Sequence, residues 1–97
     1  IIPNIEPKLS ISPNPFNPLT TIEYSIPTGT SMRARLDVYD LRGALIKTLV
    51  DEIRSPGVHS VVWDGTDDSG NNVSSGVYIY RIKVGSNFDT KKMTLIR

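Results

Sequence analysis

The sequence of 97 residues contains no cysteine, so disulfide bonds and thiolate metal sites are excluded. No apolar run approaches the ~20 residues that a helix needs to cross a membrane. Neither sign of charge is in marked excess, because 11 basic and 10 acidic residues leave a net charge of +1. Proteins that bind nucleic acid through its phosphates need a cationic excess, so we expect no nucleic-acid partner.

The length is that of one small domain, which buries roughly 60–65% of its unfolded surface. The chain opens with Ile-Ile-Pro-Asn and shows neither an initiator Met nor a signal peptide. We therefore expect residues 1–8 to be the remnant of a linker. Residues 9–97 are expected to form one domain of a larger protein.

Apolar and polar residues alternate through most of the chain, which is the pattern of half-buried β-strands. Strands are predicted over residues 9–12, 21–26, 33–38, 45–50, 58–63, 76–84 and 88–96. The stretch 45–50 is apolar on both faces, so its register is ambiguous. Three prolines within residues 13–18 bar both a helix and a central strand, and predict a rigid crossing there.

Seven short strands, no helical window and a Trp on a middle strand predict an all-β, seven-stranded immunoglobulin-like β-sandwich. A small open barrel is the alternative. The alternation assigns these large side chains to the core: Tyr24, Trp63, Tyr78, Tyr80, Met93 and Leu95. The other aromatic residues, Phe16, Tyr39 and Phe88, form no stripe in sequence, which disfavours an aromatic platform for sugars.

An Asp/Gly-rich loop follows Trp63. Its oxygen-bearing side chains are Asp64, Asp67, Asp68, Asn71 and Asn72. Such hard oxygen ligands suit calcium, but the EF-hand spacing is absent because Ser75 stands where that loop needs a Glu. Asx-turns combined with positive φ at Gly65 and Gly70 explain the same composition. We favour the turn interpretation, and a weak calcium site at Asp64, Asp67, Asp68 and Asn71 stays the alternative; no other cofactor or metal is expected.

Catalysis is not indicated by the side chains present. His59 is the only histidine, and the serines near it in sequence lie in turns, so a histidine-based triad has no evident nucleophile. Its place on the face of Val61 and Trp63 predicts a packed or rim residue. A sandwich of this size leaves little room for a cleft with paired carboxylates. We expect no enzymatic activity and no catalytic residues.

Several ordered motifs span about residues 9–97. They are P-N-P-F-N-P (13–18), T-T-I-E-Y-S-I-P (20–27), V-Y-D-L-R-G (38–43), T-L-V-D (48–51), G-V-H-S-V-V-W-D-G (57–65), S-G-V-Y-I-Y-R (75–81) and K-K-M-T-L-I-R (91–97). Together they resemble the type A C-terminal sorting domain of the type IX (Por) secretion system, which is related to the Ig-like domain of the flagellar hook-cap protein. One departure is Ser55-Pro56-Gly57, where Ala-Gly is commoner in that family.

The resemblance implies a sorting signal rather than an enzyme. Such a domain is read in the periplasm, and an outer-membrane translocon then carries the cargo, here the part of the protein preceding residue 1, to the cell surface or the medium. A sortase-like peptidase usually removes the domain. The family's recognition segment falls on Lys91, Lys92, Met93, Thr94, Leu95, Ile96 and Arg97. The family signature falls on Trp63, Asp64, Gly65, Gly76, Tyr78 and Tyr80.

The terminal residues themselves allow two interpretations. A last strand with two lysines and an alternating apolar face can pair with a partner at a sheet edge. Alternatively, Lys91 and Lys92 only protect that edge from unwanted pairing. Two other functions also stay open: a retained structural or carbohydrate-contacting accessory module of a secreted enzyme, and a piece of a flagellar hook-cap scaffold.

Overall fold

The computed structural model describes residues 9–12, 19–27, 29 and 31–96. Its strands are β1 (Leu9–Ser12), β2 (Thr20–Ile26), β3 (Met32–Asp40), β4 (Leu45–Arg54), β5 (Gly57–Trp63), β6 (Gly76–Val84) and β7 (Asn87–Leu95). This part of the chain contains no helix, so none is long and apolar enough to span a membrane. The all-β prediction is confirmed. The predicted linker at 1–8, the proline-rich crossing at 13–18 and Arg97 lie outside the described residues.

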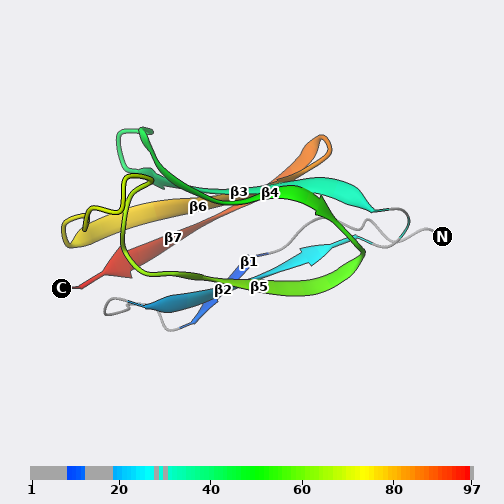
Figure 1. The fold of residues 1–97 in the computed structure, drawn as a ribbon, viewed down its shortest axis with the longest axis horizontal. Coiled ribbons are helices and arrows are strands. Elements are labelled where there is room, and N and C mark those ends of the chain that lie inside the picture. The colour runs from blue at the N-terminus through cyan, green and yellow to red at the C-terminus, as the bar shows by residue number, and fades with distance from the viewer. Residues whose placement is uncertain (1–8, 13–18, 28, 30, 97) are drawn as a thin grey trace.

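Two antiparallel sheets form the molecule, with the strand orders β1-β2-β5 and β4-β3-β6-β7. They stack as two layers in Figure 1. The fold is therefore a sandwich, and the alternative prediction of a small open barrel is wrong. The strands β2 to β7 span seven to ten residues each, whereas β1 spans only four. The sandwich therefore rests on six long strands, and β1 adds a short edge beside β2.

The core lies between the layers and follows the alternation in the sequence. In β2, the side chains of Ile22, Tyr24 and Ile26 are buried while their neighbours are not. The other buried apolar residues are Leu9, Ala34, Leu36, Val38, Val50, Trp63, Tyr78, Tyr80, Ile82, Val84, Met93 and Leu95. All the side chains that the sequence assigns to the core are among them. Apolar burial is thus the main term that holds the two sheets together.

The strand β4 differs from its prediction in two ways. It continues past Val50 to Arg54, so the charged residues Asp51 and Glu52 lie within it. Its pairing with β3 also shifts register between Leu36 and Asp37 and again between Val38 and Tyr39. These irregularities break the two-residue period, which explains why the sequence leaves the register ambiguous. Charged residues are tolerated here because β4 is an edge strand with one side toward solvent.

Candidate functional site

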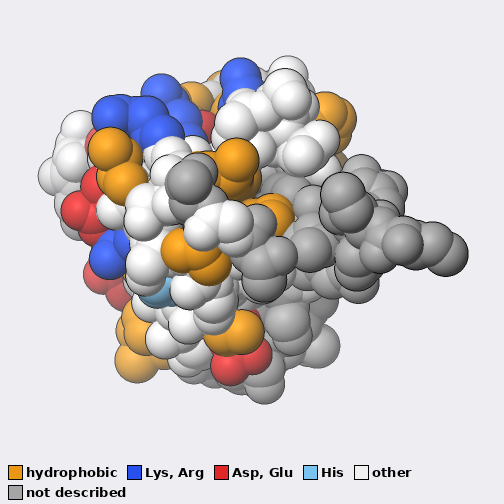
Figure 2. Space-filling model, turned by 90° about the vertical axis from the view of Figure 1, so that its right-hand side faces the viewer, with side chains coloured by type: hydrophobic (Ala, Val, Ile, Leu, Met, Phe, Trp, Pro, Cys, Tyr) orange, Lys and Arg blue, Asp and Glu red, His pale blue; other side chains and the backbone are white. Residues whose placement is uncertain are grey.

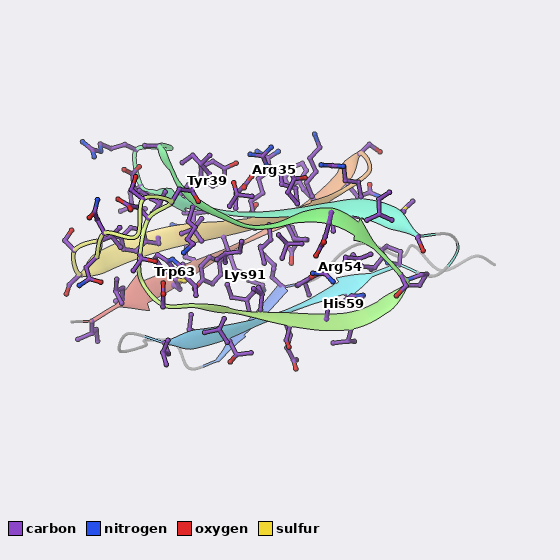
Figure 3. All side chains as sticks on the ribbon, viewed as in Figure 1. Arg35, Tyr39, Arg54, His59, Trp63 and Lys91 are labelled. Atoms are coloured by element: carbon purple, nitrogen blue, oxygen red, sulfur yellow. The ribbon has the colours of Figure 1, made fainter. Side chains whose placement is uncertain are left out.

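The strand β7 is an edge of the four-stranded sheet, and among the residues that the structure describes it pairs only with β6. Lys91 lies opposite Tyr80 and Met93 opposite Tyr78, so both face the core side of the sheet. Lys92 alternates to the outer side, and Figure 3 shows Lys91 between the two layers. Met93 and Leu95 are 1% and 0% exposed. The predicted recognition segment therefore combines two core residues, Met93 and Leu95, with exposed ones.

Charged side chains on the inner side of β7 mark the point where the core ends. Asp89 lies two residues before Lys91 on the same side, and its Oδ2 accepts a hydrogen bond of 3.0 Å from the backbone N–H of Leu9. This bond ties β1 of one sheet to β7 of the other. Inward-pointing charges are a common protection of edge strands against pairing. Lys91 thus fits the protective interpretation; its side chain is exposed, as are those of Lys92 and Ile96.

Trp63 is the centre of the signature residues. Its indole packs edge-to-face against the rings of Tyr78 and Tyr80, at centroid distances of 5.4 and 5.9 Å. The indole N–H donates to the carbonyl oxygen of Thr66 at 2.8 Å. The hydroxyl of Tyr78 donates to the carbonyl oxygen of Ser74 at 2.6 Å. That bond, at the start of the penultimate strand, is the tyrosine corner of Ig-like sandwiches. The signature thus fastens both ends of the Asp/Gly loop to the core.

The Asp/Gly loop is built from turns, as expected. Oδ1 of Asp64 accepts hydrogen bonds from the Thr66 hydroxyl at 2.5 Å and from the Thr66 N–H at 3.2 Å. Oδ1 of Asp67 accepts from the N–H groups of Ser69 and Asn71, both at 2.9 Å. The bond from the Thr66 hydroxyl is the main reason why the pKa of Asp64 lies below its usual value. The predicted Asx-turns are confirmed.

The two glycines of the loop have the positive φ expected of them, 77° at Gly65 and 85° at Gly70. Asp68 reaches out of the loop and accepts a 3.3 Å hydrogen bond from the N–H of Thr48. Among the described residues, no three Asp, Glu or His side chains gather as a metal site would require. Calcium binding stays a prediction.

His59 is a packed residue at the rim, as predicted. Its ring stacks on Tyr24 with centroids 5.5 Å apart, and its Nε2 shares a 2.8 Å hydrogen bond with the carbonyl oxygen of Ser55. Arg54, which forms an ion pair with Glu52, lies nearby between the layers in Figure 3. Burial raises the pKa of Tyr24, and Arg54 partly offsets this effect. The contacts of His59 are those of a structural residue.

The outer face of the four-stranded sheet holds a polar network that the sequence analysis missed. Asp37 is 5% exposed and accepts hydrogen bonds from Arg35 Nε at 2.8 Å, the Tyr39 hydroxyl at 3.1 Å and the Thr48 hydroxyl at 2.8 Å. Burial, together with the charge of Asp37, raises the pKa of Tyr39. Arg35 and Tyr39 stand on the outer side of the sheet in Figure 3. The alternation of β3 places Arg35, Asp37 and Tyr39 on one face, and β4 adds Thr48 to the network.

Tyr39 and Phe88, which form no stripe in sequence, meet at one shallow cavity on this face. The guanidinium of Arg81 lies over the Phe88 ring, 4.6 Å from its centroid. The register brings the two together, since β6 lies between β3 and β7. The strand order β3-β6-β7 is needed to predict an aromatic and cationic surface here, and the sequence does not reveal that order.

Comparison with known proteins gives one family and several related folds. The model of the FlgD Ig-like domain family matches residues 20–87. No curated protein matches the chain. Among solved structures, dimeric latent PorU from Porphyromonas gingivalis is similar over 99% of the chain, with a TM-score of 0.78 and 22% identity. The chain corresponds to 10% of that protein.

Two further solved structures share the fold. PorZ, described as an essential bacterial surface component of the type IX secretion system of P. gingivalis, matches 92% of the chain at a TM-score of 0.64 and 21% identity. FlgD from P. aeruginosa matches 93% at 0.59 and 20%. The chain spans 11% of PorZ and 64% of this FlgD.

Proposed function

The chain belongs to the family of the FlgD Ig-like domain, and from this premise we propose that it is a non-catalytic sorting module of the type IX secretion system, type A. The ordered motifs from residue 13 to residue 97 support this function. The likeness in fold to parts of PorU and PorZ is consistent with it. In this proposal the module follows a cargo protein, needs no cofactor, and is read in the periplasm by the outer-membrane translocon. The cargo then reaches the cell surface or the medium, and a sortase-like peptidase removes the module.

The terminal edge strand is the observation that carries the proposal. Met93 and Leu95 anchor β7 in the core, while Lys92 and Ile96 are exposed beside them. A partner can therefore recognise the exposed residues of the segment on the folded module, while β7 stays paired in the sheet. An edge strand also offers backbone groups for pairing with a partner strand. Recognition through shape and edge hydrogen bonds requires no catalytic group in the module.

The experiment fuses residues 1–97 to a periplasmic reporter in a host that possesses the secretion system. Deleting residues 91–97 is a poor test, because it removes Met93 and Leu95 and unfolds the core. Lys92→Glu combined with Ile96→Ser changes exposed positions only. Arg42→Glu, on the turn after β3, is the matched control because its side chain is 89% exposed.

The parent fusion and the Arg42→Glu fusion are expected at the cell surface or in the medium. The Lys92→Glu/Ile96→Ser fusion is expected to stay in the periplasm with an unchanged circular dichroism spectrum. Retention of the parent fusion would refute the sorting function. Equal export of all three fusions would refute the role of the terminal segment.

A retained accessory module is the second candidate. The cavity of Tyr39, Ile79 and Phe88 on the outer sheet face favours it, because exposed aromatic rings suit contact with carbohydrate or with a neighbouring domain. The intact mass of the secreted cargo separates the two functions. A sorting module is absent from the mature protein after cleavage, whereas an accessory module remains attached.

A further inference from the structure

Four cationic side chains form a block on the outer face of the four-stranded sheet. Arg33 and Arg35 alternate along β3, and Arg81 and Lys83 alternate along the neighbouring β6. Figure 2 shows Lys and Arg side chains gathered at the top of the view, on the side of this sheet. The acidic residues among them are Asp51, which pairs with Arg33 at 2.9 Å, and the buried Asp37. The exposed face thus carries a local positive excess in a nearly neutral protein.

Two like charges face each other inside this block. Arg35 and Lys83 are direct partners across the β3–β6 ladder. Like charges at directly opposed positions destabilise a sheet. The Nε of Arg35 donates to Asp37, but Lys83 forms no ion pair with any residue that the structure describes. The repulsion is therefore not relieved on the Lys83 side.

Arg81, in the same block, has a buried hydrogen-bond donor that is not satisfied within the described residues. Its Nε is buried and has no hydrogen-bond partner within the described part of the chain. A buried donor without an acceptor costs free energy, so such groups are rare unless they serve a ligand or a site. Arg81 lines a cavity of about 230 Å³ together with Arg35, Asp37, Tyr39 and Lys83. Uncompensated local conflicts of this kind concentrate at functional sites.

We propose that this face binds an extended acidic segment of a polypeptide that runs along β6 and places alternate carboxylates on Arg81 and on the opposed pair of Lys83 and Arg35. Residues two apart in an extended chain are separated by about 6.5–7 Å, which is also the spacing of Arg81 and Lys83 along β6. Arginine guanidinium groups bind carboxylates through paired hydrogen bonds. The intervening side chains of the segment would point away from the sheet, because successive side chains of an extended chain alternate between its two faces.

The charge distribution favours a peptide over nucleic acid or a membrane. Those partners are held by extended cationic surfaces, and their affinity grows with each phosphate neutralised. Here the block holds only four of the 11 basic residues, and the whole chain has a net charge of only +1. A short run of carboxylates matches such a block in size and sign. This binding is independent of whether the module directs secretion.

The test is a fluorescence anisotropy titration of the 97-residue module with a labelled peptide of sequence Glu-Thr-Glu-Val-Glu-Thr-Glu. The control peptide carries Gln in place of every Glu. Lys83→Glu and Arg81→Gln are the test variants, and Arg42→Glu is the control variant outside the block. Sodium polyphosphate and phosphatidylglycerol vesicles are titrated in parallel.

We expect the acidic peptide to bind about tenfold or more tightly than the Gln peptide, which corresponds to the loss of a few charge-assisted contacts. Lys83→Glu and Arg81→Gln should each weaken binding by about tenfold, and Arg42→Glu by less than about twofold. Lys83→Glu should melt no lower than the parent, because it replaces a repulsive pair with an attractive one. Loss of binding in that variant therefore cannot be attributed to unfolding.

Three results would overturn the proposal. The first is equal affinity for the Glu and Gln peptides. The second is unchanged affinity in the Lys83→Glu variant. The third is binding of polyphosphate or of the vesicles without binding of the acidic peptide, which would assign the face to a different class of ligand. None of these measurements uses the secretion system, so failure here leaves the sorting proposal to its own test.

Discussion

Tyr78 and Tyr80 stand two residues apart on the inner face of β6, yet within the described residues only the Tyr78 hydroxyl has an acceptor. The Tyr78 hydroxyl donates to the Ser74 carbonyl at 2.6 Å, whereas the Tyr80 hydroxyl is buried without a partner in the described part of the chain. Both rings pack on Trp63. The same residue type therefore serves as a hydrogen-bonded corner in one place and as a volume filler in the other.

Removing the two hydroxyls should have opposite consequences. Tyr78→Phe loses the corner bond to the Ser74 carbonyl, so we expect it to lower the free energy of unfolding by about 1–2 kcal/mol. Tyr80→Phe removes a buried, unsatisfied group and should be neutral or stabilising. Urea denaturation measures both. Equal losses in the two variants would show that the Tyr80 hydroxyl is satisfied in solution.

Trp63 joins the two sheets and holds the Asp/Gly loop, so its truncation should be the most costly core substitution. Trp63→Ala leaves a large cavity and is expected to lower the free energy of unfolding by roughly 3–5 kcal/mol. Val62→Ala, on the opposite face of β5 where its side chain is 53% exposed, is the control and should change it by less than about 0.5 kcal/mol. Similar losses in both variants would contradict the burial that we describe for Trp63.

The fold could be predicted where one face of a strand is buried and the other is not. Ile22 and Tyr24 in β2 alternate with polar neighbours, Ile82 in β6 lies between Arg81 and Lys83, and the core follows that alternation. The sequence predicts the start of β4 but neither its register nor its extension to Arg54, because two register shifts and a solvent-facing edge remove the alternation on which such a prediction depends. A bulge is a property of two paired strands, so the sequence of one strand alone does not predict it.

The candidate sites were harder to predict for the same reason. The repulsive pair of Arg35 and Lys83 requires the register between β3 and β6, and these residues are far apart in sequence. Tyr39 and Phe88 meet only because β6 lies between their strands. The Asp/Gly loop was predictable, since Asx-turns and glycine turns are local and depend on residues a few positions apart.

The repulsion between Arg35 and Lys83 predicts a stabilising substitution. Lys83→Glu places opposite charges at directly opposed positions, and we expect the free energy of unfolding to rise by about 0.2–1 kcal/mol. Lys83→Gln should give a smaller gain, because it removes the repulsion without adding attraction. Thermal and urea unfolding at low salt measure both variants. The gain should shrink in 1 M NaCl, where charges at this exposed face are screened; a gain that persists in salt would have another cause.

Chelation tests the alternative interpretation of the Asp/Gly loop. The Oδ1 atoms of Asp64 and Asp67 already accept hydrogen bonds from loop N–H and hydroxyl groups. We therefore expect the melting temperature to stay unchanged in EDTA and after addition of millimolar calcium. A melting temperature that rises with calcium would establish an ion site, since a ligand that binds only the folded state stabilises it. Magnesium at the same concentration controls for ionic strength.

Acid should weaken the module through the carboxyl group of Asp64. The Thr66 hydroxyl and, less strongly, Lys47 hold the pKa of Asp64 below its ordinary value. A carboxyl whose pKa is lower in the folded state stabilises it above the ordinary pKa of about 3.9, and this contribution is lost as the pH falls through the folded-state pKa. Asp64→Asn keeps an oxygen acceptor for Thr66 but cannot titrate. We expect its stability to fall less than that of the parent between pH 5 and pH 2.5, in urea unfolding at each pH. Parallel stability curves for the two proteins would show that Asp64 does not contribute to the acid sensitivity.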